Sequence, residues 1–141
     1  MRARPGGLTI AWIAGAACLL GGCGPSDRDL VRAKVDQFLK ATASKDYATM
    51  CNQVLAPALL AHLSAGGIKC EQAMQIALGG VKSPSLSIGR IDIHGQKASV
   101  ITLTTAAGQQ ASLDAIELTK TGSGWRVESL GTPVVPAVKK K

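Results

Sequence analysis

Aromatic residues are scarce in this chain of 141 residues: they make up 3% of it, as one Phe, one Tyr and two Trp. Proteins that bind single-stranded nucleic acids set aromatic rings among basic side chains, so that bases stack on the rings while the cations hold the backbone. The chain has no such interleaved stretch. We therefore expect no nucleic-acid partner.

The motifs of several enzyme classes are missing as well. No glycine-rich phosphate loop follows a predicted strand, and no serine stands in the setting of a nucleophile elbow. His62 and His94 lack the spacing of metal ligands relative to each other and to the cysteines, and we interpret both as structural or surface residues. The sequence therefore predicts no metal and no cofactor, and it offers little support for an enzyme.

The apolar stretch near the N-terminus is too short to cross a membrane. Residues 8–20 are uncharged and largely apolar, but 13 residues at about 1.5 Å each cannot span a hydrocarbon core of about 30 Å. Arg2 and Arg4 precede this stretch. A short positive segment followed by a short apolar one is typical of a secretory signal peptide.

A lipidation signal follows directly. The segment Leu20-Gly21-Gly22-Cys23 resembles the lipobox of bacterial lipoproteins, in which a Leu and two small residues precede the Cys that receives the lipid. The resemblance implies that residues 1–22 are removed, that Cys23 is lipidated, and that residues 23–26 tether the protein to the extracytoplasmic face of the cell membrane. Two alternatives stay open: an ordinary secretory signal with Cys23 as a free thiol, and a retained membrane anchor.

Positive charge is concentrated at the two ends of the chain. The formal charge of +7 falls to +5 without Arg2 and Arg4, and Lys139, Lys140 and Lys141 supply three of the remaining positive charges. The high isoelectric point therefore does not predict a basic binding surface on the folded part. We expect residues 132–141 to form a disordered basic tail, which either contacts anionic lipid headgroups or stays solvated.

The four cysteines divide into two groups. Cys18 belongs to the predicted leader and Cys23 to the lipid anchor, which leaves Cys51 and Cys70. In an oxidising compartment a remaining pair of cysteines predicts one disulfide. It would stabilise the fold by about 3 kcal/mol, mostly by restricting the unfolded chain. Two separate buried thiols are the alternative.

The remaining pattern changes from helices to strands at Pro84. Apolar periodicity and turn residues predict helices over 27–43, 46–53, 57–64 and 70–78. Alternating Ile, Val, Leu and Thr then predict strands over 86–94, 97–105, 110–121 and 125–130, each joined to the next by a short turn. Ser26 is the expected N-cap of the first helix, Ser44 or Lys45 opens the second, and a change of parity around Gly89 predicts a β-bulge. The order predicts an α+β fold.

The layout resembles the nuclear transport factor 2-like superfamily and its small actinobacterial lipoprotein members. The resemblance rests on Phe38-Leu39-Lys40-Ala41, Lys45-Asp46-Tyr47 and Gly124-Trp125-Arg126-Val127, and it covers residues 27–131. It implies one α+β domain in which a long N-terminal helix and short helices pack on a curved, four-stranded antiparallel meander. Such a cone can enclose an apolar pocket.

Asp114 and Tyr47 are the candidate pocket residues. Asp114 shares strand parity with Ile116 and Leu118, so it faces the interior if they do, and a desolvated carboxylate can act as a general base. Alternatively, it stays solvated near its turn or caps a backbone amide. Tyr47 is either a pocket hydroxyl or a packing residue.

We assign Phe38 and Trp125 to the core. The strand acids, Asp92 and Glu117, are expected to face outward.

These observations favour a membrane-anchored lipoprotein of the cell envelope that is not an enzyme. It would bind a small apolar ligand or a partner protein, or support a larger envelope complex as an accessory protein. The alternative is a small isomerase- or dehydratase-like enzyme that uses Asp114 or Tyr47.

Overall fold

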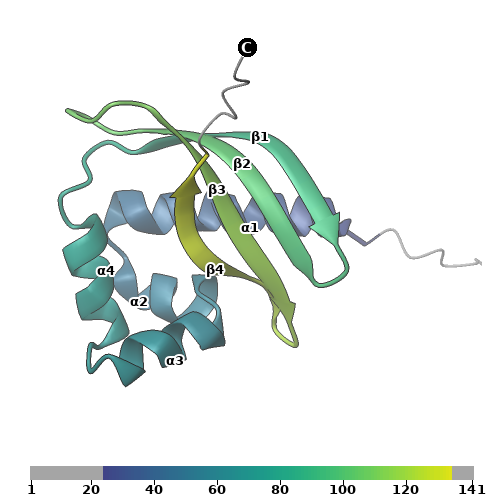
Figure 1. Cartoon of the computed structure of the whole chain (residues 1–141), viewed down its shortest axis with the longest axis horizontal. Helices are drawn as coiled ribbons and strands as arrows, with labels where there is room; N and C mark the ends of the chain where they lie inside the picture. Colours follow the sequence, from purple (N-terminus) through teal and green to yellow (C-terminus); the bar gives the residue numbers. More distant parts are fainter. Residues whose placement is uncertain (1–23, 135–141) are drawn as a thin grey trace, which may run out of the picture.

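The computed structural model describes residues 24–134. The predicted leader, the predicted lipidation site Cys23 and residues 135–141 of the predicted tail lie outside the described residues. Residues 24–134 form an α+β domain in which helices precede an antiparallel sheet (Figure 1). Within this range, no helix combines the length and the apolar character that crossing a membrane requires.

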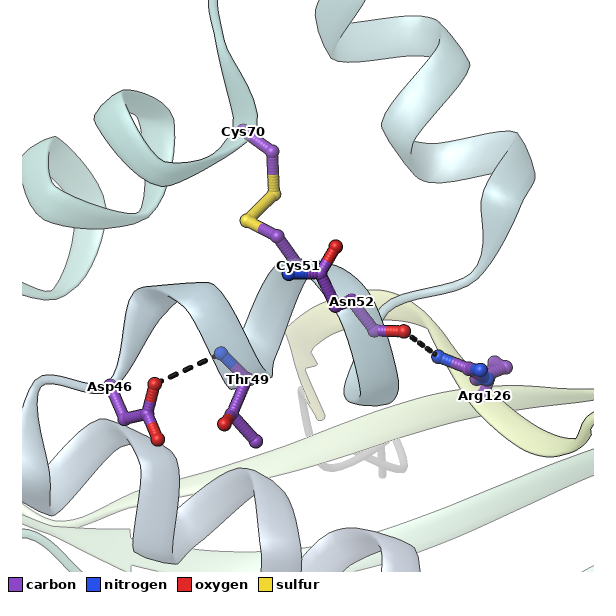
Figure 2. Close-up of a disulfide and its surroundings, with 6 residues drawn as sticks. All are labelled: Asp46, Thr49, Cys51, Asn52, Cys70 and Arg126. Carbon is purple, nitrogen blue, oxygen red and sulfur yellow. Dashed lines mark hydrogen bonds between the residues drawn. A yellow bond between two sulfur atoms is a disulfide. The ribbon is translucent and has the colours of Figure 1, made fainter.

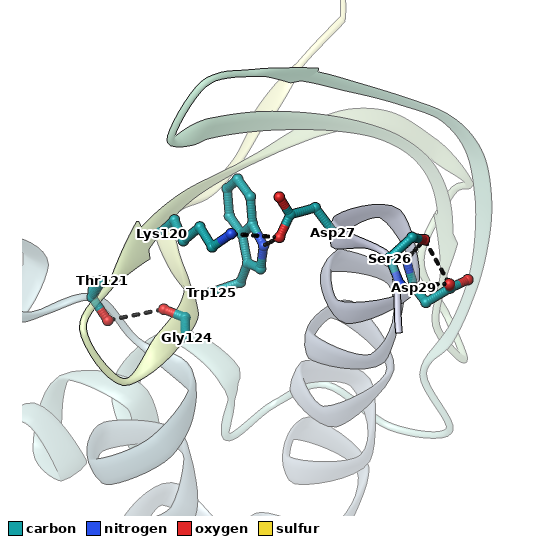
Figure 3. Close-up of polar contacts among 7 residues, drawn as sticks. All are labelled: Ser26, Asp27, Asp29, Lys120, Thr121, Gly124 and Trp125. Atoms are coloured by element: carbon teal, nitrogen blue, oxygen red, sulfur yellow. Dashed lines mark hydrogen bonds and ion pairs between the residues drawn. The ribbon is translucent and has the colours of Figure 1, made fainter. Parts of the chain in front are cut away.

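The first helix, α1, spans Asp27–Ser44, one residue more than the predicted range. Ser26 is its N-cap, as predicted. The Asp29 amide donates to Ser26 Oγ at 3.2 Å, and the Ser26 amide donates to Asp29 Oδ2 at 3.1 Å, which completes a capping box (Figure 3). The helix ends where Lys45 adopts a left-handed conformation with φ of 59°.

The second predicted helix is two different elements. A single turn, α2 (Tyr47–Thr49), runs into a π-helix, η1 (Met50–Val54). Neither Ser44 nor Lys45 opens α2, contrary to the prediction. Asp46 does so instead, because its carboxylate accepts a hydrogen bond from the Thr49 amide at 2.9 Å (Figure 2). The Ser44 hydroxyl donates back to the Lys40 carbonyl within α1.

Two further helices complete the helical half. They are α3 (Pro57–Ala65), one residue longer than predicted, and α4 (Cys70–Leu78), which has the predicted bounds. The predicted Cys51–Cys70 disulfide is confirmed, with the two Cα atoms 6.0 Å apart. It ties η1 to the first residue of α4, as Figure 2 shows. This crosslink joins segments that are too short to be stable helices alone.

The strands form a meander in the order β1-β2-β3-β4, and every pair is antiparallel. Their bounds are β1 (Ser85–His94), β2 (Lys97–Thr105), β3 (Ser112–Thr121) and β4 (Gly124–Pro133). The sheet is open rather than closed into a barrel, and its strands curve visibly in Figure 1. The predicted bulge at Gly89 is confirmed, because the register between β1 and β2 shifts between Ile88 and Ile91.

The end of β4 differs from the prediction. The predicted strand ends at residue 130 and the predicted tail begins at residue 132, but residues 131–133 continue the strand, and the Val134 amide donates to the Leu113 carbonyl at 2.8 Å. Leu118 of β3 pairs with Val127 of β4, and Asp114 pairs with Pro133. Between these two pairs β4 contains two more residues than β3, and two register shifts take up the difference. The sequence pattern ends the strand at residue 130 because glycine and proline follow at Gly131 and Pro133, and both are typical of turns and strand ends. The strand β3 also begins later than predicted, at Ser112.

The core lies between α1 and the inner face of the sheet. Val31 and Val35 of α1 are fully buried, and so is Val127 of β4. Trp125 is 2% exposed, which confirms that it belongs to the core. Further buried side chains come from every other strand and from the short helices: Met50, Val54, Leu55, Met74, Ile91, Ala98, Val100, Ile116 and Leu118.

A polar contact ties the start of α1 to the start of β4. Asp27 Oδ1 accepts from Trp125 Nε1 at 3.0 Å and from Lys120 Nζ at 2.7 Å (Figure 3). The hydrogen bond from Lys120, followed by the one from Trp125, lowers the pKa of the Asp27 carboxyl from its ordinary value. The contact joins residues about a hundred positions apart and thereby fixes the end of the helix nearest to Cys23.

Candidate functional site

The inner face of the sheet changes from apolar to polar along β2 and β3. Ala98 and Val100 of β2 are buried, and the same face continues through Thr102 to Thr104. On β3 the matching face runs from Leu118 and Ile116 back to Asp114 and Ser112, with Thr102 opposite Asp114 and Thr104 opposite Ser112. The polar residues therefore gather at one end of the concave face.

A pocket of about 170 Å³ opens at this polar end. Three parts of the chain form its walls: the second half of α1, the segment from the end of α4 into β1, and the neighbouring ends of the strands. Its apolar lining comes mainly from Phe38, Leu39, Leu78, Val81, Leu86 and Leu130. Its polar lining includes Thr104, Gln109, Gln110 and Asp114. The pocket thus has an apolar body and one polar side.

Asp114 is the charged residue of this lining. Its Oδ2 atom accepts hydrogen bonds from Thr104 Oγ1 at 2.7 Å and from Ser112 Oγ at 2.6 Å. The backbone of β4 passes close by at Gly131, whose φ is 103°, and a Cβ atom there would lie 3.5 Å from the Asp114 Cβ. The expectation that Asp114 shares a face with Ile116 and Leu118 is confirmed, and its side chain is half-buried.

The segment between α4 and β1, residues 79–84, is held in place by two contacts. Lys45 Nζ donates to the carbonyl oxygens of Leu78 and Val81, both of which line the pocket. The Ala107 amide donates to the Lys82 carbonyl at 2.9 Å. These bonds fasten one pocket wall to the end of α1 and to the β2–β3 turn. Sequence reasoning missed Lys45, because its partners are backbone carbonyls more than 30 positions away.

Tyr47 lies away from Asp114. It is half-buried, packs against the core, and lines a second hollow between η1, α3 and α4. That hollow is lined largely by polar side chains and by the disulfide, including Asn52, Lys69, Glu71 and Gln72. The structure therefore places the two predicted pocket residues in different hollows and does not bring them together.

The other residues considered from sequence have structural or surface surroundings. His62 and His94 are exposed. Asp92 pairs with Arg90 at 2.6 Å, and Glu117 accepts from Ser99 Oγ at 2.8 Å. Phe38 is only partly buried and belongs to the pocket wall as well as to the edge of the core. Within residues 24–134, no group of three or more His, Cys, Asp or Glu side chains is arranged to hold a metal ion.

Comparison with protein-family models, curated proteins and solved structures finds no match to this chain. A dry apolar cavity of about 150 Å³ can hold a molecule the size of benzene, and this pocket has about 170 Å³. The carboxylate of Asp114 adds a hydrogen-bond acceptor at its edge.

Proposed function

We propose that this protein is a lipid-anchored lipoprotein of the cell envelope whose nuclear transport factor 2-like domain binds a small, largely apolar ligand. The observation that carries the proposal is the pocket of about 170 Å³ between α1, the α4–β1 segment and the concave face of the sheet. Ligand sites of this kind are concave, mostly apolar, and carry a few polar groups that orient the ligand. The order of helices followed by a bulged meander also supports a cone-like domain.

Binding is favoured over catalysis by the surroundings of Asp114. An acid–base enzyme usually pairs its acid with a second titratable group; Tyr47 belongs to the other hollow, and the other polar residues of this pocket lining carry hydroxyls and amides. The polar groups bonded to the Asp114 carboxylate are Thr104 and Ser112, two hydroxyls that hold it in place. The proposal therefore assigns Asp114 an orienting role at the wall of a binding pocket.

Filling the pocket tests the binding role. Ala106 lines the pocket, whereas Ala107, the next residue in the same turn, is exposed and outside the lining. Ala106→Phe is expected to weaken binding of cyclohexanol at least tenfold because the ring occupies the cavity, and Ala107→Phe should leave binding within about twofold. Affinity is measured by NMR titration of residues 23–141 carrying Cys23→Ser. Equal affinities for both variants would contradict a ligand site in this pocket.

The anchor is tested separately in cells. Cys23→Ala is expected to abolish incorporation of labelled palmitate and to release the protein from the membrane fraction, because a thioether-linked lipid needs the Cys23 sulfur. Cys18→Ala, which changes a cysteine inside the predicted leader, serves as the matched control and should be processed normally. A Cys23→Ala protein that is still labelled and still sediments with membranes would overturn the anchor.

A further inference from the structure

Asp114 is the one charged residue type in the pocket lining, and it has no ion-pair partner among residues 24–134. The ion pairs of residues 24–134 are Arg90–Asp92, Lys97–Glu128 and Lys120–Asp27, and none of them includes Asp114. Two hydroxyls donate to one of its oxygens, and no Lys, Arg or His of the described chain forms an ion pair with it.

The carboxylate is also oriented before any ligand arrives. Thr104 and Ser112 donate to Oδ2 from two neighbouring strands, and their own oxygens lie 2.8 Å apart. These contacts among three oxygens fix the direction of the Asp114 side chain. Ligand binding therefore costs little additional side-chain entropy. An ionised carboxylate only accepts hydrogen bonds, so its complement is a donor, and a cationic donor gives the strongest pairing.

The rest of the pocket selects the body of the ligand. Phe38, Leu39, Leu78 and Leu86 provide apolar walls, and Gln109 and Gln110 also belong to the lining. A primary ammonium group has three donors, enough to reach the carboxylate and neighbouring amide or hydroxyl oxygens. The hydrocarbon part of a bound amine would displace water from beside the carboxylate, and a lower local dielectric strengthens the attraction between ammonium and carboxylate.

We propose that the pocket recognises small hydrophobic amines, with the ammonium group paired to Asp114 and the hydrocarbon part against the apolar walls. This inference rests on the proposed binding function and names the class of its ligand. A cavity of about 150 Å³ holds one benzene molecule. The volume of about 170 Å³ therefore suits a single six-membered ring or a short branched alkyl chain.

Three probes of one shape test the inference: cyclohexylamine, cyclohexanol and cyclohexanecarboxylate, each titrated into residues 23–141 with Cys23→Ser at pH 7. The amine is expected to bind at least tenfold more tightly than the alcohol, and the carboxylate more weakly than the alcohol. Asp114→Asn, which keeps shape and removes charge, should weaken amine binding about 10–100-fold, in line with the loss of a charged hydrogen bond. Alcohol binding should change less than about threefold.

Two further variants, Asp114→Glu and Ser112→Ala, keep the test valid if Asp114→Asn does not fold. Asp114→Glu retains the charge and should preserve part of the preference for the amine over the alcohol. Ser112→Ala removes one hydrogen bond to the carboxylate and should reduce this preference without abolishing it. If amine and alcohol bind the unmodified pocket equally, the amine inference is wrong although a binding pocket remains. If none of the three probes binds, the proposed binding function itself fails.

Discussion

Trp125→Ala is expected to lower the free energy of unfolding by about 3–5 kcal/mol, the range seen when large buried aromatic side chains are truncated. Trp125 is 2% exposed and belongs to the core formed by α1, the sheet and the short helices. Truncation removes its packing contacts, and it also deprives Asp27 of the indole donor. The measurement is urea unfolding at neutral pH, followed by circular dichroism.

Trp125→Phe separates packing from hydrogen bonding. Phenylalanine retains much of the buried surface but lacks the N–H group that donates to Asp27 at 3.0 Å. We therefore expect a smaller loss for Trp125→Phe than for Trp125→Ala, made up of a partial cavity and about 1 kcal/mol for the hydrogen bond. A loss below about 1 kcal/mol for Trp125→Ala would mean that this side chain does not support the core as the structure indicates.

Removing the disulfide is expected to cost about 3 kcal/mol. The bond joins residues separated by 19 positions. Closing a loop of this length lowers the entropy of the unfolded chain and thereby raises the free energy of unfolding by roughly that amount. The double variant Cys51→Ser with Cys70→Ser should therefore unfold at a lower urea concentration than the oxidised protein. The segments that it joins, η1 and α4, are short elements that need tertiary contacts to persist.

Chemical reduction is the matched control for the disulfide variant. The unmodified protein in excess reductant should unfold at nearly the same urea midpoint as the double variant, because both lack the crosslink. Exposed Ala107→Ser, which is remote from the disulfide in the fold's β2–β3 turn, should leave the midpoint unchanged. Identical midpoints for oxidised and reduced protein would refute a stabilising role for the bond.

Much of the secondary structure follows from local patterns. The bounds of β2 and α4 agree with the prediction, because alternating β-branched residues and flanking glycines are read over a few positions. The Ser26 cap and the bulge beside Gly89 are local as well. The π-helix η1 does not follow from a local pattern. Its five residues have the same apolar spacing as an α-helix, and the choice between the two helix types depends on the neighbours that cover them.

The candidate site was only partly foreseen. Strand parity correctly placed Asp114 on the same face as Ile116 and Leu118. The hydroxyls of Thr104 and Ser112 were not predicted to hold its carboxylate, since the pairing of β2 with β3 determines which side chains meet. The last strand was predicted to end at residue 130 and the tail to begin at residue 132, and both bounds were wrong: β4 continues to Pro133, with two register shifts against β3, and Gly131 lies beside Asp114.

The order of helices and strands, the α+β class and the expectation of a Cys51–Cys70 disulfide follow from short periodicities, turn residues and the number of cysteines. The pocket depends on tertiary contacts. Lys45 closes one wall through backbone carbonyls, and Asp114 and Tyr47 separate into different hollows. Such contacts join residues dozens of positions apart, and they arise from how the sheet bends and where α1 lies on it, which no local pattern encodes.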